Sequence, residues 1–250
     1  MKLKLHLLSL LAIVIICGCR KDQLNDCFQS TGKDKTITRS LSPFTKIKAG
    51  EKFDIILTQD TGQEEEVKIT CGSHLAGQIT TVVQNNTLTI ENKNTCNFVR
   101  SYDRKISIEV RVRYLDDIEI YSATNLSSND TLNFENKSLT LKNFGLGDVN
   151  LKLKAGILAV RCINSGDIIL EGFSNILSCS VEEATQFDAR KLLCDDVYVD
   201  CHTPLDCFVN ARNYLYAKIF NDGNVMYVSE PKFKLELVEK RGDGELKLIK

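Results

Sequence analysis

The chain has 250 residues, enough for one large or two small domains, and 43% of them are hydrophobic, which predicts a buried core and argues against global disorder. Its formal net charge of -1 lacks the basic excess typical of nucleic-acid-binding proteins. We therefore expect a folded protein with no nucleic-acid partner.

Residues 1–18 predict a lipoprotein signal peptide. Lys2 and Lys4 precede an apolar run over residues 7–16, about ten residues long and too short to cross a bilayer as a helix. The segment Ile16-Cys17-Gly18-Cys19 resembles a bacterial lipobox, which predicts lipidation of Cys19. The alternative is an ordinary cleaved signal with an incidental Cys19. We expect an outer-membrane lipoprotein that faces the periplasm or the cell surface.

Residues 19–40 are polar and lack periodicity, which predicts a lipid-anchored tether. Eight cysteines remain after Cys17 and Cys19 are set aside, a number natural for an exported protein, and an even count permits disulfides without defining their connectivity. We expect a bridge between Cys71 and Cys96, which flank one excursion of the chain. Cys201-His202 with Cys207 comes closest to a metal site, but zinc spacing is missing. We predict no metal and no other cofactor.

Residues 41–115 predict β-strands that pack on a following repeat region or cap it. Apolar residues recur at every second position in short segments between Phe44 and Val112. A weak helical pattern covers residues 73–80, where Leu75 and Ile79 are four positions apart.

Residues 116–228 predict a solenoid. Five-residue corners recur at intervals of 18 to 23 residues, each with an acid or amide in fourth place and an apolar residue in fifth. The polar residues are Asn125, Asp148, Asp167, Gln186, Asp206 and Asn224. A period near 20 with recurrent inward apolar positions is typical of stacked coils. We expect an all-β fold, a right-handed parallel β-helix of about six rungs, with residues 229–250 as a charged C-terminal cap.

The corner residues have a structural and a catalytic interpretation. Carboxylates in a row on a β-helix are found in polysaccharide lyases and hydrolases, but this row alternates acids with amides, which favours a structural ladder in the turns. We expect Gly147, Gly166 and Gly223 to adopt the positive φ of a tight corner. The fifth corner, Thr203–Cys207, contains Pro204 and breaks the pattern, so we expect any specialised site there.

Several segments resemble one family in order and spacing. Phe44–Ile47 and Phe53–Gln59 resemble its opening strands, while the Gly-Asp-Val corner and Asp222–Pro231 resemble its repeats and ending. This is the putative auto-transporter adhesin, head GIN domain family, a group of exported bacterial lipoproteins of unknown function. The resemblance covers roughly residues 41–249 and implies one β-solenoid domain over residues 41–250. Arg113 stands where the family usually has proline.

The anchor and the solenoid predict an exported adhesin or envelope structural protein that binds a glycan or a protein on its surface, not an enzyme. A carbohydrate-active β-helix enzyme and a periplasm-facing scaffold are the alternatives. Cys201 and His202 are neighbours in a predicted strand and would point apart, which argues against nucleophilic catalysis. Tyr214 and Tyr216 share a strand face and would either line a ligand surface or pack half-buried on the sheet.

Overall fold

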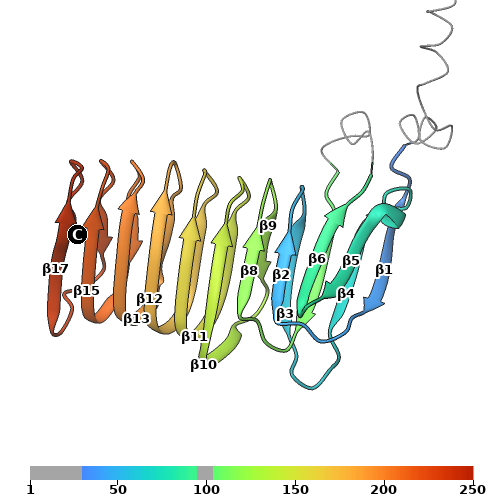
Figure 1. The fold of residues 1–250 in the computed structure, drawn as a ribbon, viewed down its shortest axis with the longest axis horizontal. Coiled ribbons are helices and arrows are strands. Elements are labelled where there is room, and N and C mark those ends of the chain that lie inside the picture. The colour runs from blue at the N-terminus through green and yellow to red at the C-terminus, as the bar shows by residue number, and fades with distance from the viewer. Residues whose placement is uncertain (1–29, 95–103, 250) are drawn as a thin grey trace, which may run out of the picture.

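The computed structural model describes residues 30–94 and 104–249. It confirms the predicted all-β solenoid, with about seven turns where the sequence predicted about six (Figure 1). The predicted signal peptide, Cys19 and Cys96 lie outside the described residues. No helix in the described ranges is long and apolar enough to cross a membrane.

The secondary structure of residues 30–94 and 104–249 consists of eighteen strands and one short 3₁₀ helix. The elements are β1 (Asp34–Ser40), β2 (Lys46–Ala49), β3 (Asp54–Gln59), β4 (Glu66–Gly72), η1 (Ala76–Gln78), β5 (Ile79–Gln84), β6 (Thr87–Asn92), β7 (Ser107–Val112), β8 (Asp117–Ile120), β9 (Asn125–Ser128), β10 (Leu132–Asn143), β11 (Val149–Cys162), β12 (Ile168–Glu182), β13 (Phe187–His202), β14 (Cys207–Val209), β15 (Ala211–Ile219), β16 (Val225–Tyr227), β17 (Lys234–Lys240) and β18 (Leu246–Leu248).

The strands stack into two layers, and each turn of the chain contributes to both (Figure 1). The front layer contains β6, β2, β8, the second halves of β10 to β13, β15 and β17, all parallel. The rear layer contains β7, β3, β9, the first halves of β11 to β13, β14, β16 and β18. A corner leads from the front layer of one turn to the rear layer of the next.

The core lies between the two layers and is built from aligned columns of apolar side chains. One column runs through Leu141, Val160, Cys179, Val199 and Ala217, which stand opposite one another in successive strands. All five are buried. Because side chains alternate along a strand, every second residue enters the core and the residue between faces solvent.

The N-terminal region differs in two ways from the prediction. Asp34–Ser40, within the expected tether, forms β1, which pairs antiparallel with β4. It is held there by Arg39, whose guanidinium donates to the Ile79 carbonyl at 2.8 Å and to Thr81 Oγ1 at 3.0 Å. The helical pattern over residues 73–80 yields only the single turn η1.

The opening strands of residues 41–115 are woven into the solenoid. β2 lies between β6 and β8, and β3 lies between β7 and β9. The antiparallel strands β1, β4 and β5 then close this end of the stack (Figure 1).

The C-terminal segment continues the solenoid. β17 and β18 pair in parallel with β15 and β16, so this expected cap is a further turn of the coil. Leu235 and Leu237 occupy inward positions but have no turn beyond them in the described chain, which leaves them 37% and 40% exposed.

Candidate functional site

A groove crosses the outer surface of the front layer. Its floor is a row of small side chains from successive strands, Thr140 beside Ala159 and Ala159 beside Ser178. In the next strand the same position is Tyr198, whose ring ends the row. The groove has a volume of about 600 Å³, within the range of roughly 300–1,000 Å³ that is typical of small-molecule sites. We call it the tyrosine-walled groove.

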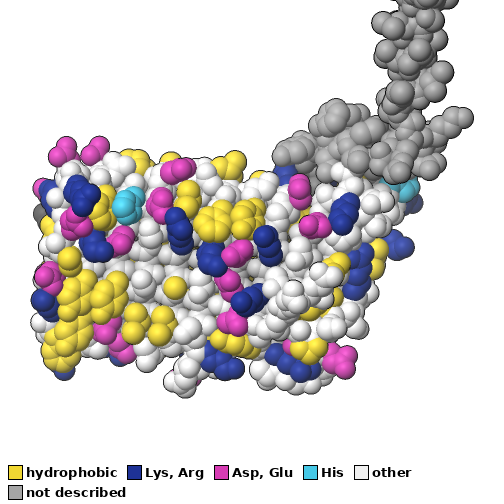
Figure 2. All heavy atoms as spheres, in the orientation of Figure 1, with side chains coloured by type: hydrophobic (Ala, Val, Ile, Leu, Met, Phe, Trp, Pro, Cys, Tyr) yellow, Lys and Arg dark blue, Asp and Glu magenta, His cyan; other side chains and the backbone are white. Residues whose placement is uncertain are grey.

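Four aromatic side chains, which we call the aromatic strip, continue from the groove toward the C-terminal end of the layer. Tyr198 and Tyr216 stack with ring centroids 5.2 Å apart and planes 7° from parallel. Tyr214 lies 6.3 Å from Tyr216 and 5.4 Å from Phe233. Tyr198 and Tyr216 stack along the solenoid axis because neighbouring parallel strands lie about 4.8 Å apart. Figure 2 shows hydrophobic side chains gathered on this part of the front surface.

One face of the Tyr198 ring adjoins the groove, since the preceding position in the row is the small Ser178. Tyr198 is 44% exposed. Tyr214 and Tyr216 are partly buried, so they fit the packed interpretation better than Tyr198 does. The exposed ring of the aromatic strip is therefore Tyr198, whereas the sequence pattern indicated Tyr214 and Tyr216.

A row of polar and charged side chains borders the groove. Lys142 Nζ lies 2.8 Å from Glu119 Oε1 and 3.2 Å from Asp117 Oδ2. The hydrogen bond from Lys142 lowers the pKa of the Glu119 carboxyl and in turn raises the pKa of the lysine. Further along the row, the nearest nitrogen–oxygen distance is 3.4 Å between Lys218 and Asp200. The row thus holds fixed donors and acceptors beside an exposed ring.

The polar corner residues are joined by hydrogen bonds that run from turn to turn. The backbone amide of Asp148 donates to Asn125 Oδ1, and that of Asp167 donates to Asp148 Oδ1, both at 3.0 Å. The amide of Asn224 donates to Asp206 Oδ1 at 3.0 Å. Each side chain therefore satisfies a backbone donor of the following turn.

The ladder extends beyond the corners recognised from the sequence. At one end Asn125 Nδ2 donates to Asp54 Oδ1 at 2.7 Å, and at the other the amide of Glu245 donates to Asn224 Oδ1 at 3.0 Å. The ladder is interrupted at Gln186, since the described structure holds no side-chain ladder bond from Asp167 to Gln186 or from Gln186 to Asp206. The Gln186 backbone carbonyl still accepts from Ile168 N at 2.9 Å, as the Asp148 carbonyl does from Leu126 N at 2.8 Å. The carboxylates of Asp148 and Asp206 are thus engaged in holding the coil.

The corner glycines have a different role from the predicted one. Gly147, Gly166 and Gly223 are not among the residues with positive φ; that conformation belongs instead to corner residues such as Ser122 and Asn164. A Cβ on Gly147 would lie 1.9 Å from the Thr124 carbonyl oxygen, and one on Gly223 would lie 2.0 Å from that of Leu205. Glycine is required here because the corners of successive turns touch.

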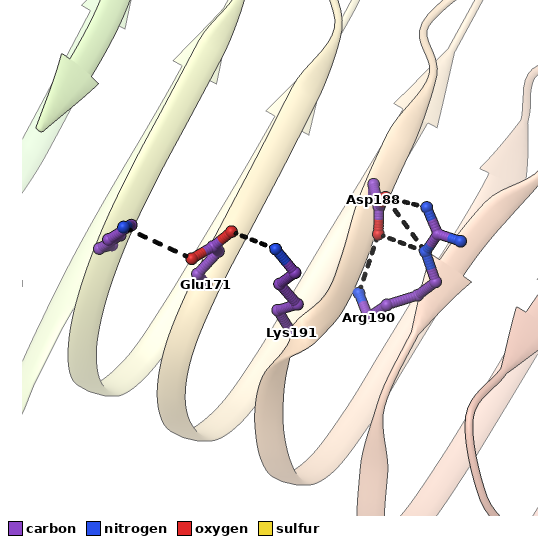
Figure 3. A network of polar contacts seen from close by, with 5 residues as sticks. Glu171, Asp188, Arg190 and Lys191 are labelled. Carbon is purple, nitrogen blue, oxygen red and sulfur yellow. Dashed lines mark hydrogen bonds and ion pairs between the residues drawn. The ribbon is translucent and has the colours of Figure 1, made fainter.

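The outer surface of the rear layer carries a second polar cluster (Figure 3). Glu171 Oε1 lies 3.0 Å from Lys191 Nζ, and its other oxygen lies 3.8 Å from Lys152 Nζ. Arg190 binds Asp188 through two nitrogens, and this guanidinium lowers the pKa of the carboxyl. The charges in this cluster are largely paired with one another, which favours a structural interpretation.

The fifth corner is built around Thr203. Its hydroxyl donates to the Thr185 carbonyl at 3.2 Å and accepts from Leu205 N at 3.1 Å. His202 stacks on Phe220 with centroids 4.1 Å apart. No group of three or more His, Cys, Asp or Glu side chains in the described ranges is arranged to hold a metal ion.

The described cysteines are buried and carry free thiols. They are Cys71, Cys162, Cys179, Cys194, Cys201 and Cys207. The predicted Cys71–Cys96 bridge involves a residue outside the described ranges and stays a prediction. Burial raises the pKa of the Cys162 thiol to about 12, so this group is an inert part of the core. Cys201 and Cys207 differ, because their sulfurs lie 3.5 Å apart across the fifth corner.

Comparison with known families decides the assignment. Residues 43–231 match the family model described as "Putative auto-transporter adhesin, head GIN domain". The chain belongs to this family. No curated protein matches it.

Solved structures share the head GIN domain fold. A putative adhesin from Bacteroides fragilis NCTC 9343 has a TM-score of 0.78 and 23% identity, covering 87% of this chain and 97% of its own. A putative adhesin from Parabacteroides merdae ATCC 43184 has a TM-score of 0.67 and 17% identity over 88% and 98%. A putative lipid binding protein from Parabacteroides distasonis ATCC 8503 has a TM-score of 0.64 and 15% identity over 88% and 98%.

The tyrosine-walled groove of this head GIN domain was missed from the sequence, although a signal for it exists. Its floor residues and Tyr198 each come one position before an inward residue of the core column, as Ser178 precedes Cys179. Aligning that outward position through the repeats places three small residues before two tyrosines. This signal is weaker than that of the corners, where the polar residues recur most clearly.

Proposed function

We propose that this head GIN domain is an exported, lipid-anchored adhesin that binds a glycan in the tyrosine-walled groove. The observation that carries the proposal is the exposed ring of Tyr198 at the end of a row of small side chains. A sugar ring has an apolar face, which suits an aromatic ring, and hydroxyl groups at its edge, which suit charged and polar neighbours. The groove offers both.

The N-terminal sequence supports the location. The lipobox-like segment ending in Cys19 would anchor the chain to the outer membrane, and the residues between Cys19 and β1 would hold the solenoid away from the lipid. Each buried CH₂ group of the acyl chains contributes about 0.8 kcal/mol to anchoring.

Binding is favoured over catalysis by the use made of the acidic side chains. Asp148 and Asp206, which would be candidates for a β-helix hydrolase, accept hydrogen bonds from the backbone of the next turn. General acid–base work on a glycosidic bond needs two carboxyl groups free to approach it from opposite sides. We therefore propose a binding protein without a cofactor.

The test of the ligand is a glycan array probed with the soluble domain, residues 30–250, followed by calorimetric titration of any oligosaccharide that binds. Tyr198→Ala should clearly reduce the binding signal on the array and weaken binding in the titration. Phe208→Ala is the matched control, since Phe208 is a half-buried aromatic residue of the rear layer under Arg190. Binding to no glycan, or equal loss in both variants, would contradict the proposal.

One relative is described as a putative lipid binding protein, so phospholipid vesicles form a second arm of the same experiment. Vesicle binding that persists in Tyr198→Ala would assign the groove no part in lipid contact.

The test of the anchor is incorporation of labelled palmitate into the full chain. We expect label in the wild type and none in Cys19→Ala. Protease treatment of intact cells then distinguishes display on the cell surface, where the domain is digested, from a periplasmic orientation, where it is protected.

A further inference from the structure

The fifth corner holds a pair of cysteines that faces the core from both sides of one turn. Cys201 is near the end of β13 and Cys207 begins β14. Both are fully buried. Their sulfurs are 3.5 Å apart, with the Cys207 thiol donating to Cys201 Sγ.

The same two positions flank each of the six corners recognised from the sequence, always six residues apart. The pairs are Ile120 and Leu126, Asn143 and Val149, Cys162 and Ile168, Val181 and Phe187, Cys201 and Cys207, and Ile219 and Val225. Both positions are cysteine in the fifth corner alone among these described pairs. Cys162 faces an isoleucine instead, so it provides an internal comparison for an unpaired thiol at the same place in the coil.

We propose that Cys201 and Cys207 form an intrachain disulfide in the exported protein. A disulfide has a sulfur–sulfur length of about 2.0 Å, so the two sulfurs must approach by a distance that rotation of one cysteine side chain can provide. Little opposes this movement, since Cys201 Sγ is otherwise held only by long contacts of 3.5 Å to the Gly223 carbonyl and 3.8 Å to the Thr203 carbonyl.

The two thiols also differ in pKa, which determines which of them reacts first in thiol–disulfide exchange. The hydrogen bond from Cys207 lowers the pKa of Cys201, and the same bond, with burial, raises the pKa of Cys207. Cys201 is therefore the better first nucleophile.

The oxidant is an external disulfide, such as that of a thiol oxidase in the export compartment or oxidised glutathione. The Cys201 thiolate attacks one sulfur of that disulfide and releases the other as a thiolate. Cys207 then gives its proton to water, and its thiolate attacks Cys201 Sγ, forming the bridge and releasing the second thiol of the oxidant. Two electrons pass from the cysteines to the oxidant, which leaves as two thiols or one dithiol.

Burial sets the time of this reaction. An oxidant cannot reach fully buried sulfurs in the finished solenoid, so exchange takes place before β15 to β18 cover the corner. The bridge would then clamp a corner where the ladder is interrupted, since the described structure has no side-chain ladder bond between Gln186 and Asp206. The proposal rests on export to an oxidising compartment but not on glycan binding.

The test uses the protein refolded from the reduced, denatured state in a glutathione redox buffer, which separates the chemistry from export. Remaining thiols are alkylated under denaturing conditions, and the chain is cleaved before aspartates. This cleavage places Cys201 in the peptide 200–205 and Cys207 in the peptide 206–221, with Cys194 in another. We expect the two peptides joined by a bridge that dithiothreitol breaks, and Cys162 alkylated.

Two variants make the result decisive. Cys207→Ser should leave Cys201 alkylated, and Ile168→Cys should create a second bridge, to Cys162, at the equivalent corner. Wild-type protein with both Cys201 and Cys207 alkylated, or with either of them bridged to another cysteine, would overturn the proposal. The bridge in refolded protein but not in protein recovered from the envelope would also overturn the proposal, because the pair could then form the bridge but would not do so in the exported protein.

Discussion

The rings of Tyr198 and Tyr216 lie 5.2 Å apart with their planes within 7° of parallel. The two residues stand opposite each other in β13 and β15, so the stack is imposed by the register of the solenoid. Tyr216 therefore supports Tyr198 from the side away from Ser178, and a ligand ring that stacks on Tyr198 would extend an ordered series.

Loss of the exposed ring should weaken glycan binding. Tyr198→Ala is expected to cost about 1–2 kcal/mol of binding free energy, or roughly five- to thirtyfold in Kd, as tyrosines at the centre of binding sites commonly do. Tyr198→Phe keeps the stack and should stay within about threefold of the wild type if stacking carries the contact. Calorimetric titration of both variants measures the difference, and a larger loss in Tyr198→Phe would assign the contact to the hydroxyl.

Removal of one corner carboxylate should loosen the coil. Asp148→Ala leaves the amide of Asp167 without its side-chain acceptor and is expected to lower the free energy of unfolding by about 0.5–1.5 kcal/mol. Asp148→Asn keeps an acceptor oxygen and should be closer to the wild type. Urea denaturation measures both. Gln186→Ala is the control, because that side chain makes no ladder bond in the described structure, and an equal loss there would refute the ladder's contribution.

A methyl group on a corner glycine should be more damaging than one on an open glycine. In Gly147→Ala the new Cβ would lie 1.9 Å from the Thr124 carbonyl oxygen, and we expect a loss of about 1–3 kcal/mol from overpacking. Gly77→Ala meets nothing within 4 Å and should change stability by less than about 0.5 kcal/mol. Thermal unfolding of the two variants compares them, and similar melting temperatures would contradict the close contact of successive corners.

Acid should remove the stabilisation contributed by the Asp188–Arg190 pair. The guanidinium lowers the pKa of Asp188 below its ordinary value of 3.8. A lowered carboxyl pKa stabilises the folded state fully above the ordinary value, and this contribution is lost as pH falls from about 3.8 through the lowered value. Asp188→Asn should therefore reduce stability at pH 7 and flatten its decline in acid. Denaturation midpoints measured from about pH 2 to about pH 7, a range that brackets the titration of aspartate, test this. Parallel curves of midpoint against pH for the variant and the wild type would contradict it.

The repeating part of the fold was predictable because every turn of the coil needs the same residue types at the same positions, so they recur with its period. An acid or amide such as Asp148 accepts a hydrogen bond from the backbone of the next turn, and the apolar residue after it, Val149, enters the core. The arrangement of residues 41–115 was not predictable in the same way. Alternation in Ile55 and Leu57 shows that one side of β3 is buried, but it does not say which strands lie beside it.

The tyrosine-walled groove illustrates a related limit of prediction from the sequence. Ala159 and Ser178 are unremarkable as single residues, and they matter because the register places them in one row with Tyr198. A function that depends on a row of neighbours from different turns becomes visible once the turns are aligned. The predicted positive φ of the corner glycines was wrong for another reason. Close approach between successive turns, not backbone conformation, requires glycine at Gly147.

The position of β2 between β6 and β8 sets an order of assembly. The strands β2 and β3 are synthesised early, yet one edge of each stays open until β8 and β9 have emerged. The first part of the solenoid must therefore close as one non-local unit, with its slow loop closures made together. Each later turn pairs with strand edges that have already formed, so these turns can be added one at a time. Truncation from the C-terminus should shorten the rod stepwise, whereas loss of β2 and β3 would remove the template on which every later turn is laid.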